Sequence, residues 1–197
     1  FMFFDFQANS LVSGLWESDG TPEGTLRLNS VVGNFLTPFA GGVIFNGLGA
    51  NGREGPWVSD GTPAGTRLVT TLDPDASDGS FSRNFIPLGS QAIFTAERFP
   101  LGDRLWRTDG TAAGTSVLQD LGAFPASSSP RGLRPIAGSL YFTAEQRGEA
   151  PGLWKSDGTA AGTVRLHEAS SDSTSTAPTL VGDRLFFAAT VPTNFFP

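Results

Sequence analysis

Two groups of aspartates have a spacing that could hold a calcium ion. Asp73, Asp75 and Asp78 lie together in the segment LDPDASDGS, close to the spacing of an acidic calcium-binding loop. Four other aspartates each begin an Asp-Gly-Thr motif beside hydroxyl side chains: Asp19, Asp60, Asp109 and Asp157. Calcium takes about six to eight oxygen ligands, usually from several carboxylates. Because each motif offers one carboxylate, we interpret these four as turn caps. For the first group we favour a solvated loop between units, with calcium binding as the alternative.

Few other residues of the chain suggest a reactive site. The chain has no cysteine, which excludes disulfides, iron–sulfur clusters and thiol catalysis, and its one histidine, His167, excludes sites that need two. Gly47, Gly49 and Gly52 match G-x-G-x-x-G, but a strand-like segment follows them, so we expect a hairpin loop and not a nucleotide site. We therefore predict no catalytic residues, no cofactor apart from the calcium candidate, and no enzymatic activity. A hydrolase or lyase whose carboxylates meet only in the folded chain stays open.

The motif aspartates belong to a repeat that runs along the whole chain. Each of the four tryptophans stands three residues before one of them: Trp16, Trp57, Trp106 and Trp154. A phenylalanine precedes each tryptophan by twelve residues, at Phe4, Phe45, Phe94 and Phe142, and Phe187 begins a fifth copy. A proline stands seven residues before three of these, at Pro38, Pro87 and Pro135. We divide the chain into units at about 1–37, 38–86, 87–134 and 135–179, with the first strand of a further unit at 180–197.

Each unit contains four short apolar segments, none with a helical period. The Phe and Trp segments are apolar at consecutive positions, which indicates strands covered on both faces. Four antiparallel strands in a repeat of this length are typical of a β-propeller blade. We therefore predict an all-β chain of about four such blades. The repeated Trp and Phe residues are expected in the core, with sugar stacking by tryptophan as the alternative.

The four motif copies resemble a known repeat. LWESDGTPEGT, PWVSDGTPAGT, LWRTDGTAAGT and LWKSDGTAAGT are similar to the ELWxxDGT repeat, also called hyalin-like, of large secreted bacterial proteins. The leading glutamate of that repeat is replaced by Gly14, Gly55, Arg104 and Gly152. The resemblance implies a β-propeller-like array in an extracellular setting, and it implies no established activity.

Charge and composition narrow the choice of partners. The net charge of −6 argues against nucleic acid, whose binding requires clustered Lys and Arg. No apolar run is long enough for a membrane-spanning helix. Our leading hypothesis is a secreted or cell-surface binding and adhesion module whose ligand is a glycan or a protein surface. The alternative is a structural building block of a larger extracellular assembly.

The ends of the chain lie within repeat units. This pattern is expected of a window from a longer array, or of a closed four-bladed ring with one redundant strand. The Phe-rich ends, FMFF and NFFP, need a cover if they are exposed. Self-association through the terminal strands is therefore a third expectation.

Overall fold

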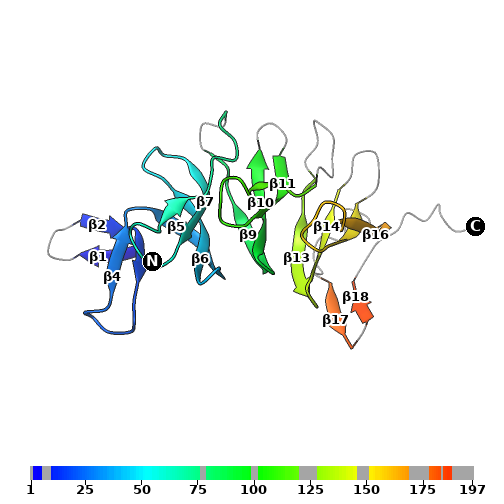
Figure 1. Ribbon diagram of the computed structural model, residues 1–197, viewed down its shortest axis with the longest axis horizontal. Coiled ribbons are helices and arrows are strands. Elements are labelled where there is room, and N and C mark those ends of the chain that lie inside the picture. Colours follow the sequence, from blue (N-terminus) through cyan, green and yellow to red (C-terminus); the bar gives the residue numbers. More distant parts are fainter. Residues whose placement is uncertain are drawn as a thin grey trace, which may run out of the picture.

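The computed structural model describes residues 2–5, 10–75, 79–98, 102–119, 128–145, 151–168, 178–182 and 184–187, of which 2–5, 10–12 and 98 are described by their backbone. Within these residues the secondary structure consists of β-strands. Three four-stranded antiparallel sheets stand side by side in a row, and shorter two-stranded sheets lie at both ends (Figure 1). The predicted all-β fold with repeated four-stranded sheets is confirmed.

Each four-stranded sheet is formed by strands that are consecutive in the chain. The first contains β5 (Val32–Phe39), β6 (Gly42–Leu48), β7 (Glu54–Ser59) and β8 (Arg67–Leu68). The second contains β9 (Arg83–Leu88), β10 (Gln91–Arg98), β11 (Gly102–Thr108) and β12 (Ser116–Val117). The third contains β13 (Arg131–Ile136), β14 (Ser139–Ala144), β15 (Gly152–Ser156) and β16 (Val164–Glu168).

The twelve-residue spacing between Phe and Trp in the sequence matches the register of the two central strands. Phe and Trp lie directly opposite each other in every complete sheet, as the pairs Phe45–Trp57, Phe94–Trp106 and Phe142–Trp154. The G-x-G-x-x-G glycines lie at the end of β6 and in the hairpin loop that leads to β7, as expected.

Each first strand of a sheet contains a bulge three residues before its proline. The register shifts there, and the residue has a positive φ: 58° at Phe35, 57° at Asn84 and 62° at Gly132. The strands therefore start before the prolines, and the predicted unit divisions at 38, 87 and 135 fall within β5, β9 and β13.

The two ends of the row hold two-stranded sheets. At one end, β1 (Met2–Asp5) pairs with β2 (Ser10–Ser13), and β3 (Leu15–Glu17) pairs with β4 (Leu26–Asn29). At the other end, β17 (Thr179–Val181) pairs with β18 (Arg184–Phe186). Where we expected four complete units, the described residues contain three four-stranded sheets. The first unit differs because Phe4 pairs with Leu11, not with Trp16, and the strand breaks at Gly14.

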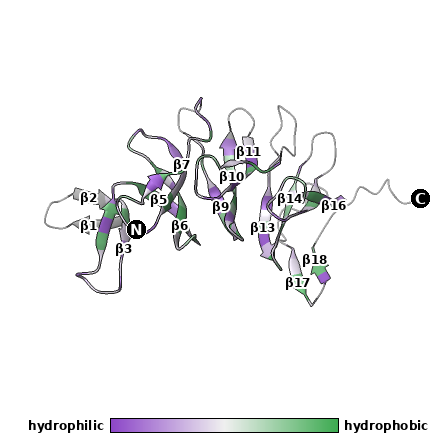
Figure 2. Cartoon of the chain, in the orientation of Figure 1, coloured by the Kyte–Doolittle hydropathy of each residue, from purple (hydrophilic) through white to green (hydrophobic). Residues whose placement is uncertain are grey.

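The hydrophobic core lies between consecutive sheets, and every cluster draws on two repeat units. Hydrophobic and hydrophilic residues are interspersed along the strands (Figure 2). One cluster joins residues of the first and second complete sheets, and another those of the second and third. A third joins Leu15, Leu28 and Val31 to Phe45 of the first complete sheet. β9 packs against β5, and β13 against β9, so the first strands of the sheets lie next to one another.

Candidate functional site

The Asp-Gly-Thr turns connect the third and fourth strands of each sheet and satisfy their own polar groups. Asp60 Oδ1 accepts hydrogen bonds from the backbone N–H and the hydroxyl of Thr62, at 2.9 and 2.7 Å. The hydroxyl of Thr62 in turn accepts from the N–H of Gly65, and the hydroxyl of Thr66 donates to the carbonyl of Thr62. The same bonds recur in the turns that begin at Asp19, Asp109 and Asp157. The four aspartates thus occupy the position of turn caps.

Steric constraints explain why both motif positions are glycine. The first has a φ of 88–94° in all four turns, a region that favours glycine. The second lies against the aspartate, so that a Cβ on Gly65 would overlap the Asp60 carboxylate. Hydrogen bonds from the threonine that follows the first glycine lower the pKa of each motif aspartate. In Asp60, Asp109 and Asp157 the bond from the threonine hydroxyl has the largest effect, followed by the bond from its backbone N–H. In Asp19 the bond from the backbone N–H of Thr21 has the largest effect.

The turns of the second and third complete sheets also pack against the preceding sheet. Gly110 lies against Phe39 and Val58 of the sheet before it, and Gly158 against Leu88 and Ile93. Arg67 donates a hydrogen bond of 2.9 Å to the carbonyl of Gly110. Consecutive units are therefore joined at the turn edge by the repeat motif itself.

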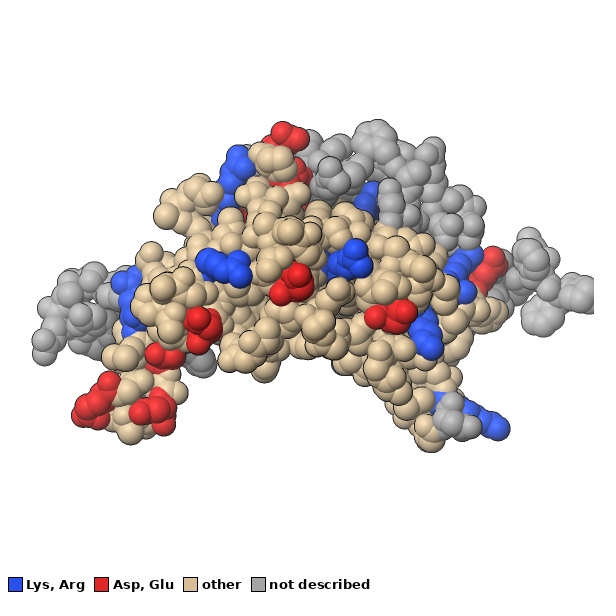
Figure 3. Space-filling model, viewed as in Figure 1, with Lys and Arg blue, Asp and Glu red and all other residues tan. Residues whose placement is uncertain are grey.

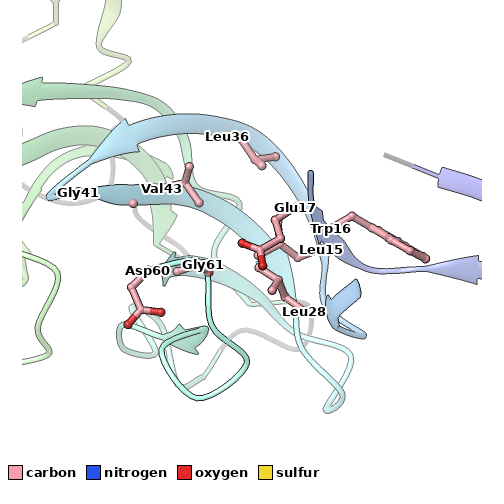
Figure 4. A pocket seen from close by; sticks show the side chains of 11 residues that line it. Leu15, Trp16, Glu17, Leu28, Leu36, Gly41, Val43, Asp60 and Gly61 are labelled. Atoms are coloured by element: carbon pink, nitrogen blue, oxygen red, sulfur yellow. Dashed lines mark hydrogen bonds between the residues drawn. The ribbon is translucent and has the colours of Figure 1, made fainter. Parts of the chain in front are cut away.

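Two clefts lie at this edge, each between neighbouring units. The first, of about 260 Å³, is lined by β3 and β4 on one side and by the turn at Asp60 and Gly61 on the other. Figure 4 shows Glu17 directed toward this turn while Trp16 points away from it. The second, of about 210 Å³, lies between the turns at Asp60 and Asp109. Both clefts lie where one unit packs against the next, so we assign them to the contact between units.

A third cleft, of about 280 Å³, lies at the opposite edge of the first complete sheet, and we call it the Trp57 cleft. It is lined by residues of the β6–β7 hairpin, of β7 and β8, and of the segment after β8: Gly49, Ala50, Asn51, Arg53, Glu54, Trp57, Leu68 and Thr71. Trp57 is only half-buried, whereas Trp106 and Trp154 are 6% and 4% exposed.

The polar side chains of the Trp57 cleft are held in place by neighbouring groups. Asn51 accepts from the N–H of Arg53 at 3.1 Å, and Arg53 donates to the carbonyl of Pro74 at 3.0 Å. Glu54 Oε2 accepts from the amide of the buried Asn46 at 3.0 Å. Among the described residues, no group bonds the second oxygen of Glu54 or the amide nitrogen of Asn51. The cleft therefore combines an indole with a carboxylate, a guanidinium and an amide of fixed position.

The structure describes the other sequence candidates in part. Asp73 is buried and accepts a hydrogen bond from the N–H of the exposed Asp75, and Asp78 lies outside the described residues. Within the described residues there is no group of three potential metal ligands. His167 is exposed on β16, and its ring meets the ring of Phe187 edge-on.

The repeated aromatic residues occupy the core in the complete sheets. Phe45, Phe94 and Phe142 are fully buried, and Trp106 and Trp154 are buried beside them. Trp16, Trp57 and Phe187 are half-buried, and the side chain of Phe4 lies outside the described part of the chain. The core interpretation thus holds for the three complete sheets except at Trp57.

The chain matches no family model and no curated protein. Among solved structures it is similar to the crystal structure of TolB from Acinetobacter baumannii, with 18% sequence identity and a TM-score of 0.47. The similarity covers 90% of this chain and 42% of that chain, so this chain spans less than half the length of the TolB structure. In the part of the chain that the structure describes, no helix could cross a membrane.

The Trp57 cleft was not among the sites expected from the sequence. The repeat predicts that all four tryptophans share one environment, because their sequence neighbours are alike. Thr71 lines the cleft because the segment after β8 runs beside the first complete sheet. The one sequence signal was the alternative of sugar stacking by tryptophan, and it did not single out Trp57.

Proposed function

We propose that the chain is a non-enzymatic, extracellular binding module of the β-propeller type, and that it holds a carbohydrate in the Trp57 cleft. The propeller arrangement is supported by four-stranded antiparallel sheets that stand in a row, pack their first strands against one another and share their cores. These are the relations between neighbouring blades of a propeller. The extracellular setting follows from the resemblance of the motif to ELWxxDGT repeats.

The observation that carries the carbohydrate proposal is the composition of the Trp57 cleft. Sugar rings present C–H groups to aromatic faces and hydroxyl groups to carboxylates, amides and guanidinium groups. The cleft offers Trp57 for the first contact and Glu54, Asn51 and Arg53 for the second. Binding sites typically combine apolar surface with a few polar groups of fixed position.

The proposal is tested on a glycan array with the wild type and two variants. Thr71→Arg places a long side chain in the Trp57 cleft, and Ala64→Arg places the same side chain on an exposed turn at the other edge of the sheet. We expect wild type and Ala64→Arg to bind the same glycans and Thr71→Arg to lose them. Equal binding by all three proteins, or by none, would overturn the assignment of the cleft.

A structural role is the second candidate, favoured by the turns that dock the second and third complete sheets on the preceding sheet. In that case the chain serves as a building block of an extracellular assembly. Hydrolysis or lyase activity is less supported, since a glycosidase needs two carboxylates at the reacting bond. The described lining of the Trp57 cleft contains one, Glu54.

A further inference from the structure

The charges around the Trp57 cleft indicate which class of carbohydrate it takes. We propose that the cleft selects amino sugars, which carry a free ammonium group, over neutral sugars. This selection rests on the proposed carbohydrate function and adds the charge of the ligand to it. It depends on the carboxylate of Glu54 and the ring of Trp57, which both line the cleft.

Glu54 presents a carboxylate that no cation of the described chain neutralises. Within the described residues, Glu54 takes part in no ion pair. Arg53, its neighbour in the chain, bonds another group, since its Nη1 donates to the carbonyl of Pro74 at 3.0 Å. An unpaired carboxylate attracts a positive charge most strongly where water is partly excluded, as in a cleft. A cationic ligand therefore supplies the charge that Glu54 lacks.

Other acidic residues offset the positive charge of Arg53. The carbonyl that holds Arg53 belongs to Pro74, and Asp73 and Asp75 stand on either side of that proline. Together with Glu54 they give three carboxylates and one guanidinium in this part of the chain. Figure 3 shows acidic and basic side chains together at the upper edge of the molecule, over the first complete sheet. The local charge and the net charge of −6 both attract an ammonium group.

A buried amide holds the carboxylate of Glu54 in one position. Asn46 is 1% exposed, and its Nδ2 donates to Glu54 Oε2 at 3.0 Å. The orientation of this amide is fixed in turn, because its Oδ1 accepts from the N–H of Ser82 at 3.0 Å. The other carboxylate oxygen, Oε1, has no hydrogen-bond partner among the described residues. Glu54 is thus positioned before a ligand arrives, which reduces the ordering cost of binding.

Trp57 contributes carbon surface to the cleft, and not its N–H group. Its Nε1 is buried and has no hydrogen-bond partner among the described residues, so the accessible part of the indole is carbon. Gly49 adjoins the six-membered ring, because a Cβ at this position would lie 3.4 Å from Cζ2. A larger residue there would cover part of the ring. Since cations are attracted to aromatic rings, an ammonium group near Trp57 and Glu54 gains from both.

The remaining polar groups of the cleft favour an amino sugar over a lysine side chain. The amide nitrogen of Asn51 has no partner among the described residues, and Thr71 adds a hydroxyl to the lining. Amide and hydroxyl groups both bond the hydroxyl groups of a sugar ring. A lysine side chain ends in an ammonium group and offers no hydroxyl to them.

Calorimetry with a matched pair of oligosaccharides tests the selection. The trimers of glucosamine and of N-acetylglucosamine share their rings and linkages, and they differ in whether the nitrogen is charged or acetylated. We expect the wild type to bind the glucosamine trimer about tenfold more tightly, and the difference to decrease as salt is added.

Two glutamate variants assign the selection to the cleft. Glu54→Gln keeps an oxygen for the amide of Asn46, and it should lower the affinity for the glucosamine trimer to that for the acetylated trimer. The control Glu23→Gln removes an exposed carboxylate from the turn that begins at Asp19, and it should retain the preference.

The possible outcomes separate the selection from the carbohydrate function. Equal binding of the two trimers by the wild type would overturn the selection and leave the carbohydrate site in place. A preference that persists in Glu54→Gln, or an equal loss of both trimers in that variant, would overturn the role of Glu54. Tighter binding of trilysine than of the glucosamine trimer would assign the cleft to a peptide instead. If neither trimer binds, the selection is wrong, and the glycan array decides on the carbohydrate function separately.

Discussion

At the scale of single residues, the repeat motif is a closed hydrogen-bonded turn. Its serine or threonine, its aspartate and its two threonines all bond within the turn, which accounts for the residue types at four of its positions. The two variable positions between the Thr and the second Gly point to solvent, as Ala112 and Ala113 do. The turn residues of the motif therefore serve the fold, and the proposed carbohydrate site takes Trp57 alone from the motif.

We predict that Gly114→Ala destabilises the protein by about 1–3 kcal/mol, the usual effect of overpacking. The new Cβ would overlap the carboxylate of Asp109 and break the cap. Chemical denaturation measures the effect, with Ala113→Ser as a control that we expect to stay within about 0.5 kcal/mol of wild type. Equal stability of the two variants would show that the turn relaxes without cost.

The four motif aspartates predict a loss of stability in acid. Their pKa values in the folded chain lie below the ordinary 3.8, because threonine side chains and backbone N–H groups donate to the carboxylates. Their contribution is complete above pH 3.8 and is lost as the pH falls through the folded values. We expect the free energy of unfolding from urea titrations to decrease there. Asp60→Asn should lower stability at neutral pH and flatten the acid decrease, whereas Glu23→Gln should leave both unchanged.

At the scale of the elements, the first strand of each sheet depends on a bulge with a positive φ. Phe35, Asn84 and Gly132 share this backbone conformation three residues before the proline. In the second and third complete sheets a threonine hydroxyl of the next strand, Thr95 or Thr143, bonds the carbonyl that precedes the bulge. The bulge therefore determines the register in which the proline and the residues after it pair with the next strand.

We expect Gly132→Val to destabilise the protein by about 1–2 kcal/mol, because a β-branched residue is strained at positive φ. The neighbouring substitution Arg131→Val changes a residue of ordinary φ in the same strand and should have little effect. Thermal unfolding of the two variants distinguishes them, and a stable Gly132→Val would mean that the bulge is not required.

The sequence predicted the elements well where repeated residues face one another. The spacing from Phe45 to Trp57 predicts both strands, and their register makes the two residues neighbours. The bulges were not predicted, since Phe35, Asn84 and Gly132 share a backbone conformation without sharing a residue type. The first unit was expected to be complete because Phe4 has the standard spacing, yet the pairing of Phe4 with Leu11 depends on local competition between strands. The Trp57 cleft depends on long-range packing, which spacing alone does not encode.

At the scale of the whole molecule, stability is shared between neighbouring units. Trp106 lies in a cluster that also contains Phe39 and Ile44 of the preceding sheet. Arrays of this kind are stabilised mainly by nearest-neighbour interfaces. No complete sheet is therefore expected to keep its full stability without its neighbour.

Hydrogen exchange of Trp106→Ala tests this coupling. We expect a global loss of about 3–5 kcal/mol, typical of a buried tryptophan, and faster exchange in β5–β8 as well as in β9–β12. Faster exchange confined to β9–β12 would instead show that the sheets are independent.

The functional claim is tested most directly by the indole N–H signals of the four tryptophans, which report on four separate sites in one NMR spectrum. Trp57→Phe assigns the signal of the Trp57 cleft. On titration with a glycan identified on the array, the Trp57 signal should shift, while the signals of the buried Trp106 and Trp154 stay unchanged. Saturable binding that leaves the Trp57 signal in place would contradict the carbohydrate site proposed here.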